Sequence, residues 1–236
     1  MAALSWHLSD FELDALLLSL RVALISVALS LPLGLGAAWL LARCRFPGKS
    51  LADSVLHLPL VMPPVVVGYG LLTLFGRRGP VGAWLHDGLG ITLAFNWKGA
   101  ALASAVMAFP LMVRAIRLSL EAVDRNLEQA GRTLGAGPVR VFFTVTLPLT
   151  APGLIGGAIL AFARSMGEFG ATITFVSNIP GETQTLPLAL YALIQQPGGE
   201  APALRIAILS IAVSFAALWG SDILARRVNR KIGRTH

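Results

Sequence analysis

Charged residues are scarce in this sequence. Only 13% of its 236 residues are Asp, Glu, Lys or Arg, whereas a water-soluble domain contains about 25%. Hydrophobic residues make up 55%, and they come in long blocks rather than at the periods of a surface helix or strand. A fold in water cannot bury so much apolar surface, so the composition excludes an ordinary soluble domain and indicates a lipid bilayer as the solvent.

Cysteine is nearly absent, and no metal-binding pattern is present. The single cysteine, Cys44, allows no disulfide within the chain. The four histidines are scattered, and none has the spacing of metal ligands. We therefore expect neither a disulfide framework nor a metal site, and we predict no bound cofactor.

Catalytic motifs are lacking as well. An intramembrane enzyme, the alternative from a different functional class, needs a nucleophile with its base or a cluster of metal ligands. The sequence has no H-E-x-x-H, no G-x-S-x-G and no histidine near Ser165. It also lacks G-x-x-x-x-G-K-[ST], which predicts that the chain does not itself hydrolyse ATP. A secondary transporter is disfavoured, because no internal repeat is visible and only Glu168 is available as an intramembrane acid.

Long apolar blocks are what the sequence does contain. A helix needs about 20 apolar residues to span the hydrocarbon. The five blocks that qualify are residues 15–41, 55–75, 99–120, 154–176 and 206–225. The run Leu186–Ile194 is too short to span, and we interpret it as an interfacial or re-entrant piece. The sequence thus predicts one all-α polytopic membrane domain over residues 1–236, with five transmembrane helices.

The positive charges predict the orientation of these spans. The net charge is +7, but the basic residues stand at the ends of apolar blocks with little aromatic interleaving, which argues against a nucleic-acid surface. One set of loops and ends holds most of them: Arg43, Arg45, Lys49, Arg114, Arg117, Arg125, Arg132, Arg140, Arg226, Arg227, Arg230, Lys231 and Arg234. The opposite set holds Arg77, Arg78 and Lys98, with Arg21 and Arg205 just inside span ends. The first set should face the cytoplasm, which places the N-terminus in the periplasm and the C-terminus in the cytoplasm.

Helix breakers interrupt the predicted spans, most clearly at the pair Pro63 and Pro64. In a bilayer, such residues survive where neighbouring helices or a water-filled cavity satisfy the freed backbone groups. Kinked helices suit a protein that opens a path. The alternative is that Gly and Pro are simply commoner in membrane helices than in soluble ones.

The longest cytoplasmic loop, residues 121–148, carries the most informative pattern. Asn126 is a plausible N-cap, with Gln129 three residues on, and a short helix is predicted over residues 127–134. Gly135 should end this helix in the left-handed conformation, and Pro138 should prevent its resumption. Pro148 is then expected to start the fourth span.

This arrangement resembles the EAA loop of the permease subunits of ATP-binding cassette (ABC) importers. The family pattern is E-A-A, three residues, G, nine residues and I-x-L-P. Here it falls on Gln129, Ala130, Gly131, Gly135, Val145, Leu147 and Pro148. The spacing is intact, although Gln129 replaces the usual acid, Glu128 stands one position earlier, Gly131 replaces the second alanine and Val145 replaces isoleucine. The alternative is a solvated amphipathic helix without a partner.

Further stretches are similar to the molybdate branch of these permeases: residues 43–48, 58–70, 162–172, 177–183 and 196–200. The resemblance implies a bacterial inner-membrane protein that carries molybdate, with tungstate as a related substrate and sulfate or thiosulfate as the alternative. It also implies four kinds of contact: a second copy of the chain, two separate ABC ATPase subunits, a periplasmic oxyanion-binding protein, and the lipid bilayer. In that family the loop helix docks in a groove of the ATPase.

A charged pair lies inside the fourth predicted span. Burying one charge at the bilayer centre costs about 2.5–3.5 kcal/mol on insertion scales. Arg164 and Glu168 are four residues apart, so they share a helix face and can pair. Neighbouring polar residues that could border a translocation path with them are Ser165, Thr172, Thr174 and Asn178. Two interpretations stay open: a path in which Arg164 offsets part of an oxyanion's charge, or an ion pair that only braces two helices.

Overall fold

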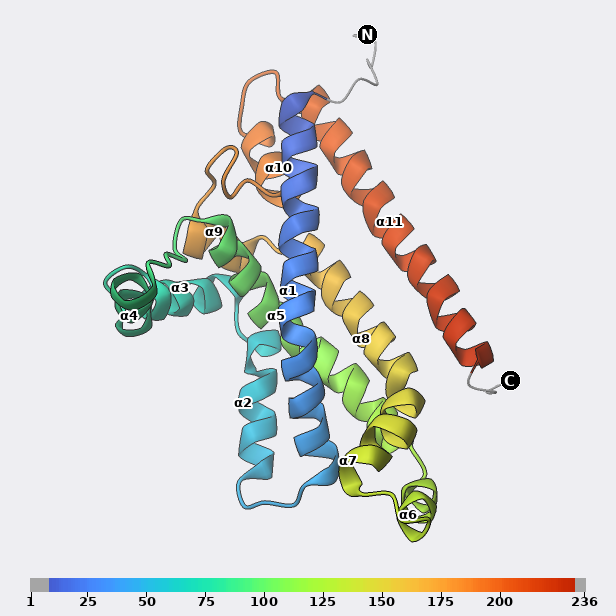
Figure 1. Cartoon of the computed structure of the whole chain (residues 1–236). Coiled ribbons are helices and arrows are strands. Elements are labelled where there is room, and N and C mark those ends of the chain that lie inside the picture. Colours follow the sequence, from blue (N-terminus) through green and yellow to red (C-terminus); the bar gives the residue numbers. More distant parts are fainter. Residues whose placement is uncertain (1–8, 232–236) are drawn as a thin grey trace.

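The structure of the chain, a computed structural model, describes residues 9–231, with side chains described as far as residue 220 except at residue 218. Every regular element in this part of the chain is a helix, as Figure 1 shows. The elements are α1 (Asp10–Arg43), α2 (Lys49–Val61), α3 (Pro64–Phe75), α4 (Pro80–Leu89), α5 (Trp97–Glu121), α6 (Arg125–Thr133), α7 (Pro138–Val141), the π-helix η1 (Phe142–Thr146), α8 (Leu147–Met166), α9 (Gly170–Val176), α10 (Leu186–Ile194) and α11 (Glu200–Lys231). The predicted all-α class is confirmed.

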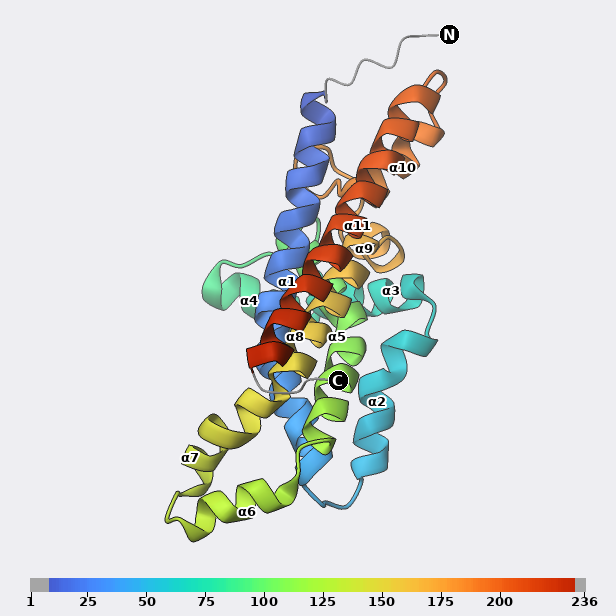
Figure 2. The ribbon, with the colours of Figure 1, turned by 90° about the vertical axis from the view of Figure 1, so that its right-hand side faces the viewer.

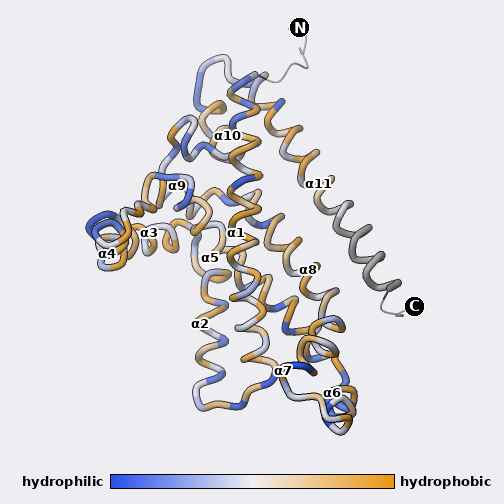
Figure 3. The backbone as a smooth tube through the Cα atoms, viewed as in Figure 1, coloured by the Kyte–Doolittle hydropathy of each residue, from blue (hydrophilic) through white to orange (hydrophobic). Residues whose placement is uncertain are grey.

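Four helical stretches between residues 9 and 231 are long and apolar enough to cross a membrane. They are Asp10–Arg43, Trp97–Glu121, Pro138–Met166 and Glu200–Ala217. A fifth span arises if the bent pair α2 and α3 is taken as one crossing, which agrees with the five spans predicted. In Figure 3 apolar residues dominate these long helices, whereas polar residues are prominent at α6 and α4.

The second span is broken at the pair Pro63 and Pro64, where the sequence has its clearest helix breakers. The chain bends by 112° between α2 and α3. Met62, which precedes Pro63, has an extended backbone, as the clash with a following proline ring favours. Pro64 then occupies the first turn of α3, where its missing N–H costs nothing. The Pro63–Pro64 pair is therefore the physical cause of the break.

The fourth span also differs from the predicted range of 154–176. A continuous helix runs from Pro138 to Met166, so the loop helix α6 does not resume at Pro138, and Pro138 starts the next helix. Pro148 has no N–H to donate, and the chain accommodates it through the π-helical turn η1, in which the N–H of Leu147 bonds the carbonyl of Phe142. The helix then ends at Met166, and α9 begins only at Gly170.

The core forms where α1, α5 and α8 pack together, around buried Met112, Ile116 and Leu120 of α5. Small residues allow the close approach that helix packing in membranes requires. At a second crossing, between α3 and α9, a Cβ on Gly68 would lie only 2.5 Å from the carbonyl oxygen of Ala171. The bundle thus packs the long helices α1, α5 and α8 at the first crossing and the short helices α3 and α9 at the second.

The two ends of the bundle carry different elements. α6 and the start of α2 lie at one end, and the start of α1 and α10 lie at the other (Figures 1 and 2). The run Leu186–Ile194, interpreted above as an interfacial or re-entrant piece, forms the short helix α10, and the N–H of Leu186 donates to Ser19 Oγ of α1 at 2.7 Å. The long helix α11 is joined to α1 by Arg205 Nε and Glu12 Oε1, 2.8 Å apart. The basic side chains predicted at positions 226–234 lie outside the described ones.

Candidate functional site

The loop helix α6 is the first part of the candidate site. It spans Arg125–Thr133, and its N-cap is Asp124, whose side chain accepts from the N–H of Asn126 at 2.9 Å. The predicted helix is therefore present, but the predicted N-cap, Asn126, is wrong by two positions. Gly135 has φ +85°, in the left-handed region as predicted. The N–H groups of Gly135 and Ala136 bond the carbonyls of Arg132 and Gly131, which closes the helix in a Schellman motif.

Glu128 anchors α6 to the transmembrane helices. Its Oε1 accepts from Arg43 Nη2 at 2.9 Å and from Thr146 Oγ1 at 2.8 Å. These partners stand at the end of α1 and in η1, so one carboxylate connects the loop helix to two span ends. The neighbouring Gln129, which the family pattern aligns with the usual acid, is exposed. In this chain the anchoring role thus belongs to the acid one position earlier.

Gly131 determines how closely α6 lies on the chain that follows it. A Cβ at this position would come within 3.2 Å of Val141 Cγ2, so glycine removes a tight contact there. Apolar side chains are exposed on α6 and at its C-terminal turn. Leu127 is 49% exposed and Leu134, just after the helix, is 88% exposed, and Ala130 between them is exposed as well. An apolar patch of this kind at a helix surface is typical of an interaction site.

The rest of the predicted loop pattern continues into the fourth span. Val145 belongs to η1, and Leu147 and Pro148 form the first turn of α8. Val145 and Leu147 are partly buried and Pro148 is exposed. These three residues therefore connect α6 and its packing partner Val141 directly to a membrane helix.

The charged pair is the second part of the site, and its position corrects the prediction. Arg164 Nη1 and Glu168 Oε2 lie 2.6 Å apart, so the pair exists. Glu168 does not lie within a helix, however, because α8 ends at Met166. Its other oxygen, Oε1, accepts from the N–H of Ala171 at 2.8 Å in the first turn of α9. Glu168 therefore joins α8 to α9 across the break, with 1% of its side chain exposed against 28% for Arg164.

The neighbouring polar residues mostly form hydrogen bonds to nearby backbone carbonyls or to another helix instead of facing a shared space. Ser165 Oγ is 3.1 Å from Ser26 Oγ of α1, and buried Thr172 donates to the carbonyl of Phe169 at 2.8 Å. The other two behave alike: Thr174 donates to the carbonyl of Gly170 at 2.9 Å and Asn178 to that of Leu188 at 3.1 Å. The structure brings Arg164 and Glu168 together, but it does not place all six residues on one open surface.

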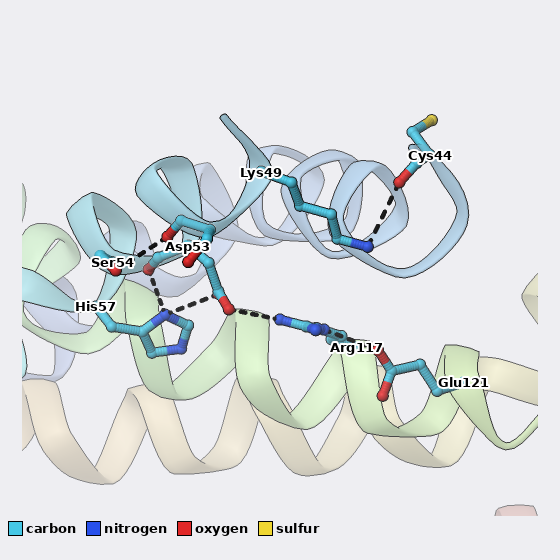
Figure 4. A network of polar contacts seen from close by, with 8 residues as sticks. Cys44, Lys49, Asp53, Ser54, His57, Arg117 and Glu121 are labelled. Carbon is cyan, nitrogen blue, oxygen red and sulfur yellow. Dashed lines mark hydrogen bonds and ion pairs between the residues drawn. The ribbon is translucent and has the colours of Figure 1, made fainter. Parts of the chain in front are cut away.

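A network between α2 and α5 was not predicted from the sequence (Figure 4). Asp53 Oδ2 lies 3.0 Å from Arg117 Nη1, and Arg117 Nε lies 2.8 Å from Glu121 Oε1. His57 Nδ1 lies 3.2 Å from the other oxygen of Asp53. The sequence carries one signal for it, because Asp53 and His57 are four residues apart, as are Arg117 and Glu121, and residues at this spacing face each other on a helix. The network joins the bent span to α5 near the end that carries α6.

Together the fold and this site define a helical subunit of a membrane transport system, with a loop helix fastened to its spans. The chain belongs to the family of binding-protein-dependent transport system inner membrane components, whose model matches residues 30–230. It is therefore an inner-membrane transport permease and not an enzyme.

Similar proteins carry substrate names. The chain is 65% identical over 227 residues to the molybdenum transport system permease protein ModB of Escherichia coli K12, covering 96% of this chain and 99% of that one. It is 57% identical to ModB of Haemophilus influenzae, with coverage of 94% and 97%. A sulfate transport system permease protein, CysW of Synechocystis, is 40% identical, with coverage of 84% and 72%.

The fold also matches solved transporters. A chain of a bacterial ABC transporter that imports the acidic polysaccharide alginate superposes with a TM-score of 0.74 at 15% identity, covering 93% of this chain and 80% of that one. A likeness at this level of identity shows a shared fold.

Proposed function

We propose that this chain is the permease of an ATP-driven importer that carries molybdate, with tungstate as a second substrate. The observation that carries this proposal is the graded identity of its relatives, since those named for molybdenum match at 65% and 57% and the one named for sulfate at 40%. Energy comes from a separate ABC ATPase. Sulfate or thiosulfate transport is the weaker alternative.

The proposed assembly has two copies of the chain, two ATPase subunits and a periplasmic oxyanion-binding protein. The structure supports a second copy, because no residue of α2 is buried in the single chain. Its exposed side chains form an apolar stripe with helical spacing: Leu51, Val55, Leu58 and Val61. A second permease would cover this stripe, whereas the charged network of the same helix lies between α2 and α5 of one copy.

We further propose that residues 121–148 form the ATPase-coupling loop, on the cytoplasmic side. The exposed apolar patch around Leu127, Ala130 and Leu134 would dock in a groove of the ATPase. Because Glu128 bonds both Arg43 and Thr146, a displacement of α6 would pull on α1 and on the helix that leads into α8. The N-terminus then lies in the periplasm and the C-terminus in the cytoplasm.

The proposed translocation path passes the break between α8 and α9. Arg164 is the partly exposed member of its ion pair, so it can meet an anion while Glu168 offsets part of its charge. A weakened attraction suits transit, because a site on a path must release what it binds. Ser165, Thr172, Thr174 and Asn178 would shape the walls around it.

Uptake by intact cells tests the proposed substrate. Cells whose own molybdenum permease is deleted should accumulate molybdate again when this chain is expressed with its ATPase and binding protein. The matched control omits only this chain. Restored sulfate accumulation without molybdate accumulation would assign the chain to the sulfate alternative.

A further inference from the structure

A large cleft lies between the C-terminal half of α1 and the loop elements α6, α7 and η1. Its volume is about 840 Å³. The two sides are formed by α1 with the residue after it, and by the segment from Arg125 to Thr146. Its lining includes Pro32, Gly36, Trp39, Arg43, Arg125 and Arg132. Neither the path nor the apolar docking patch on α6 accounts for this cleft.

Positive charge is in excess in the cleft. The charged residues of its lining are Arg43, Arg125, Arg132 and Glu128, which sum to a net charge of +2. Glu128 is bonded to Arg43, so the guanidinium groups of Arg125 and Arg132 are the uncompensated ones. These two arginines are seven residues apart on α6 and therefore stand on one face, two turns apart. Their spacing favours an anionic group between them and the end of α1.

The opposite part of the cleft is apolar and reaches far along α1. Pro32 and Arg43 are eleven positions apart, which corresponds to about 16 Å along a helix. Between them, the lining includes Gly36 and Trp39, and a Cβ on Gly36 would meet no atom within 4 Å. Trp39 is 41% exposed, and tryptophan is enriched where a span meets the headgroup layer.

We propose that this cleft binds an anionic phospholipid, with its phosphate at Arg125 and Arg132 and an acyl chain along α1. Basic pockets between membrane helices on the cytoplasmic side have the chemistry that anionic headgroups need. An acidic side chain of the cytoplasmic ATPase could pair with the arginines, but it would not extend along the apolar part of α1. A free oxyanion would likewise leave the apolar wall of the cleft without a contact. The proposal rests on the cytoplasmic orientation of α6 given above. The bound lipid would hold α6 against the end of α1, beside the bond from Glu128 to Arg43.

The chain's single cysteine gives a direct probe, because Cys44 lines the cleft. The full chain, labelled with bimane at Cys44, is placed in phosphatidylcholine nanodiscs that contain increasing fractions of brominated phosphatidylglycerol. We expect quenching at low fractions of this lipid and far less from brominated phosphatidylcholine. Each of the substitutions Arg125→Gln and Arg132→Gln should raise the fraction needed for half-quenching about fivefold.

A pair of glycine variants distinguishes the effect of filling the cleft from a general effect on the fold. Gly36→Leu should block the quenching, since its side chain enters the open space. Gly156→Leu, also in open space but outside the cleft lining, should leave quenching unchanged. Equal quenching by both brominated lipids, or full quenching in Gly36→Leu, would overturn the proposal. So would loss of quenching when the ATPase is added, because the cleft would then belong to the ATPase. The measurement uses neither ATP nor molybdate, so its failure leaves the proposed substrate untouched.

Discussion

Replacing Glu128 by alanine should release the loop helix from the membrane helices. The carboxylate makes two hydrogen bonds, one with a cationic donor, and the side chains of Arg43 and Glu128 are only 12% and 17% exposed. A hydrogen bond to a charged group contributes about 1.5–3 kcal/mol. Losing this anchor should therefore weaken the docking of α6 by about 2 kcal/mol, which corresponds to about 30-fold in an opening equilibrium.

Amide hydrogen exchange reports the release of α6, and the amount of transport per ATP hydrolysed reports the loss of coupling separately. In the Glu128→Ala transporter, amides of α6 should exchange about 30-fold faster, and ATP hydrolysis should continue while transport per ATP falls. Gln129→Ala is the matched control, because Gln129 is the exposed neighbour on the same helix. The reasoning is refuted if Glu128→Ala keeps the exchange rates and the coupling of the unmodified protein, or if Gln129→Ala is equally impaired.

Three further predictions concern the loop, the charged pair and the topology. Gly135→Val should destabilise the end of α6 by about 1–2 kcal/mol and uncouple ATPase activity from transport. The control Gly137→Val, at an extended backbone with φ −65°, should be tolerated. Equal transport flux in both variants would argue against the loop as the coupling element. Arg164→Met alone should destabilise the chain by about 3–5 kcal/mol, and combining it with Glu168→Leu should restore stability but not transport; full flux in the double variant would make the pair a brace only. In a cysteine-free background, a cysteine at Gly181 should label from the periplasm and one at Gly137 from the cytoplasm, and labelling of both from one side would contradict the topology.

Features that depend on local chemistry could be predicted from the sequence. Span existence follows from the length of apolar blocks, because the bilayer sets the length that a helix needs. The left-handed stop at Gly135 and the break at Pro63 follow from backbone sterics at single positions. The loop helix itself was also within reach, apart from its N-cap at Asp124.

Features that depend on contacts between distant segments could not be predicted. Glu128 and Arg43 are 85 positions apart, and Arg117 and Asp53 are 64 apart, so neither pairing leaves a periodic signal in the sequence. The break after Met166 was missed for a different reason. The apolar blocks on both sides of Arg164 and Glu168 predict one span, whereas the helix ends at Met166 and Glu168 bonds the first turn of α9 instead of extending α8.

Uptake of labelled molybdate by sealed vesicles tests the central claim most directly. The vesicles contain this permease with its ATPase, and the binding protein is supplied on the periplasmic side. We predict uptake that requires ATP on the ATPase side, that excess tungstate suppresses and that equal excess sulfate leaves largely unchanged. Uptake without ATP, or suppression by sulfate as strong as that by tungstate, would contradict an ATP-driven molybdate permease.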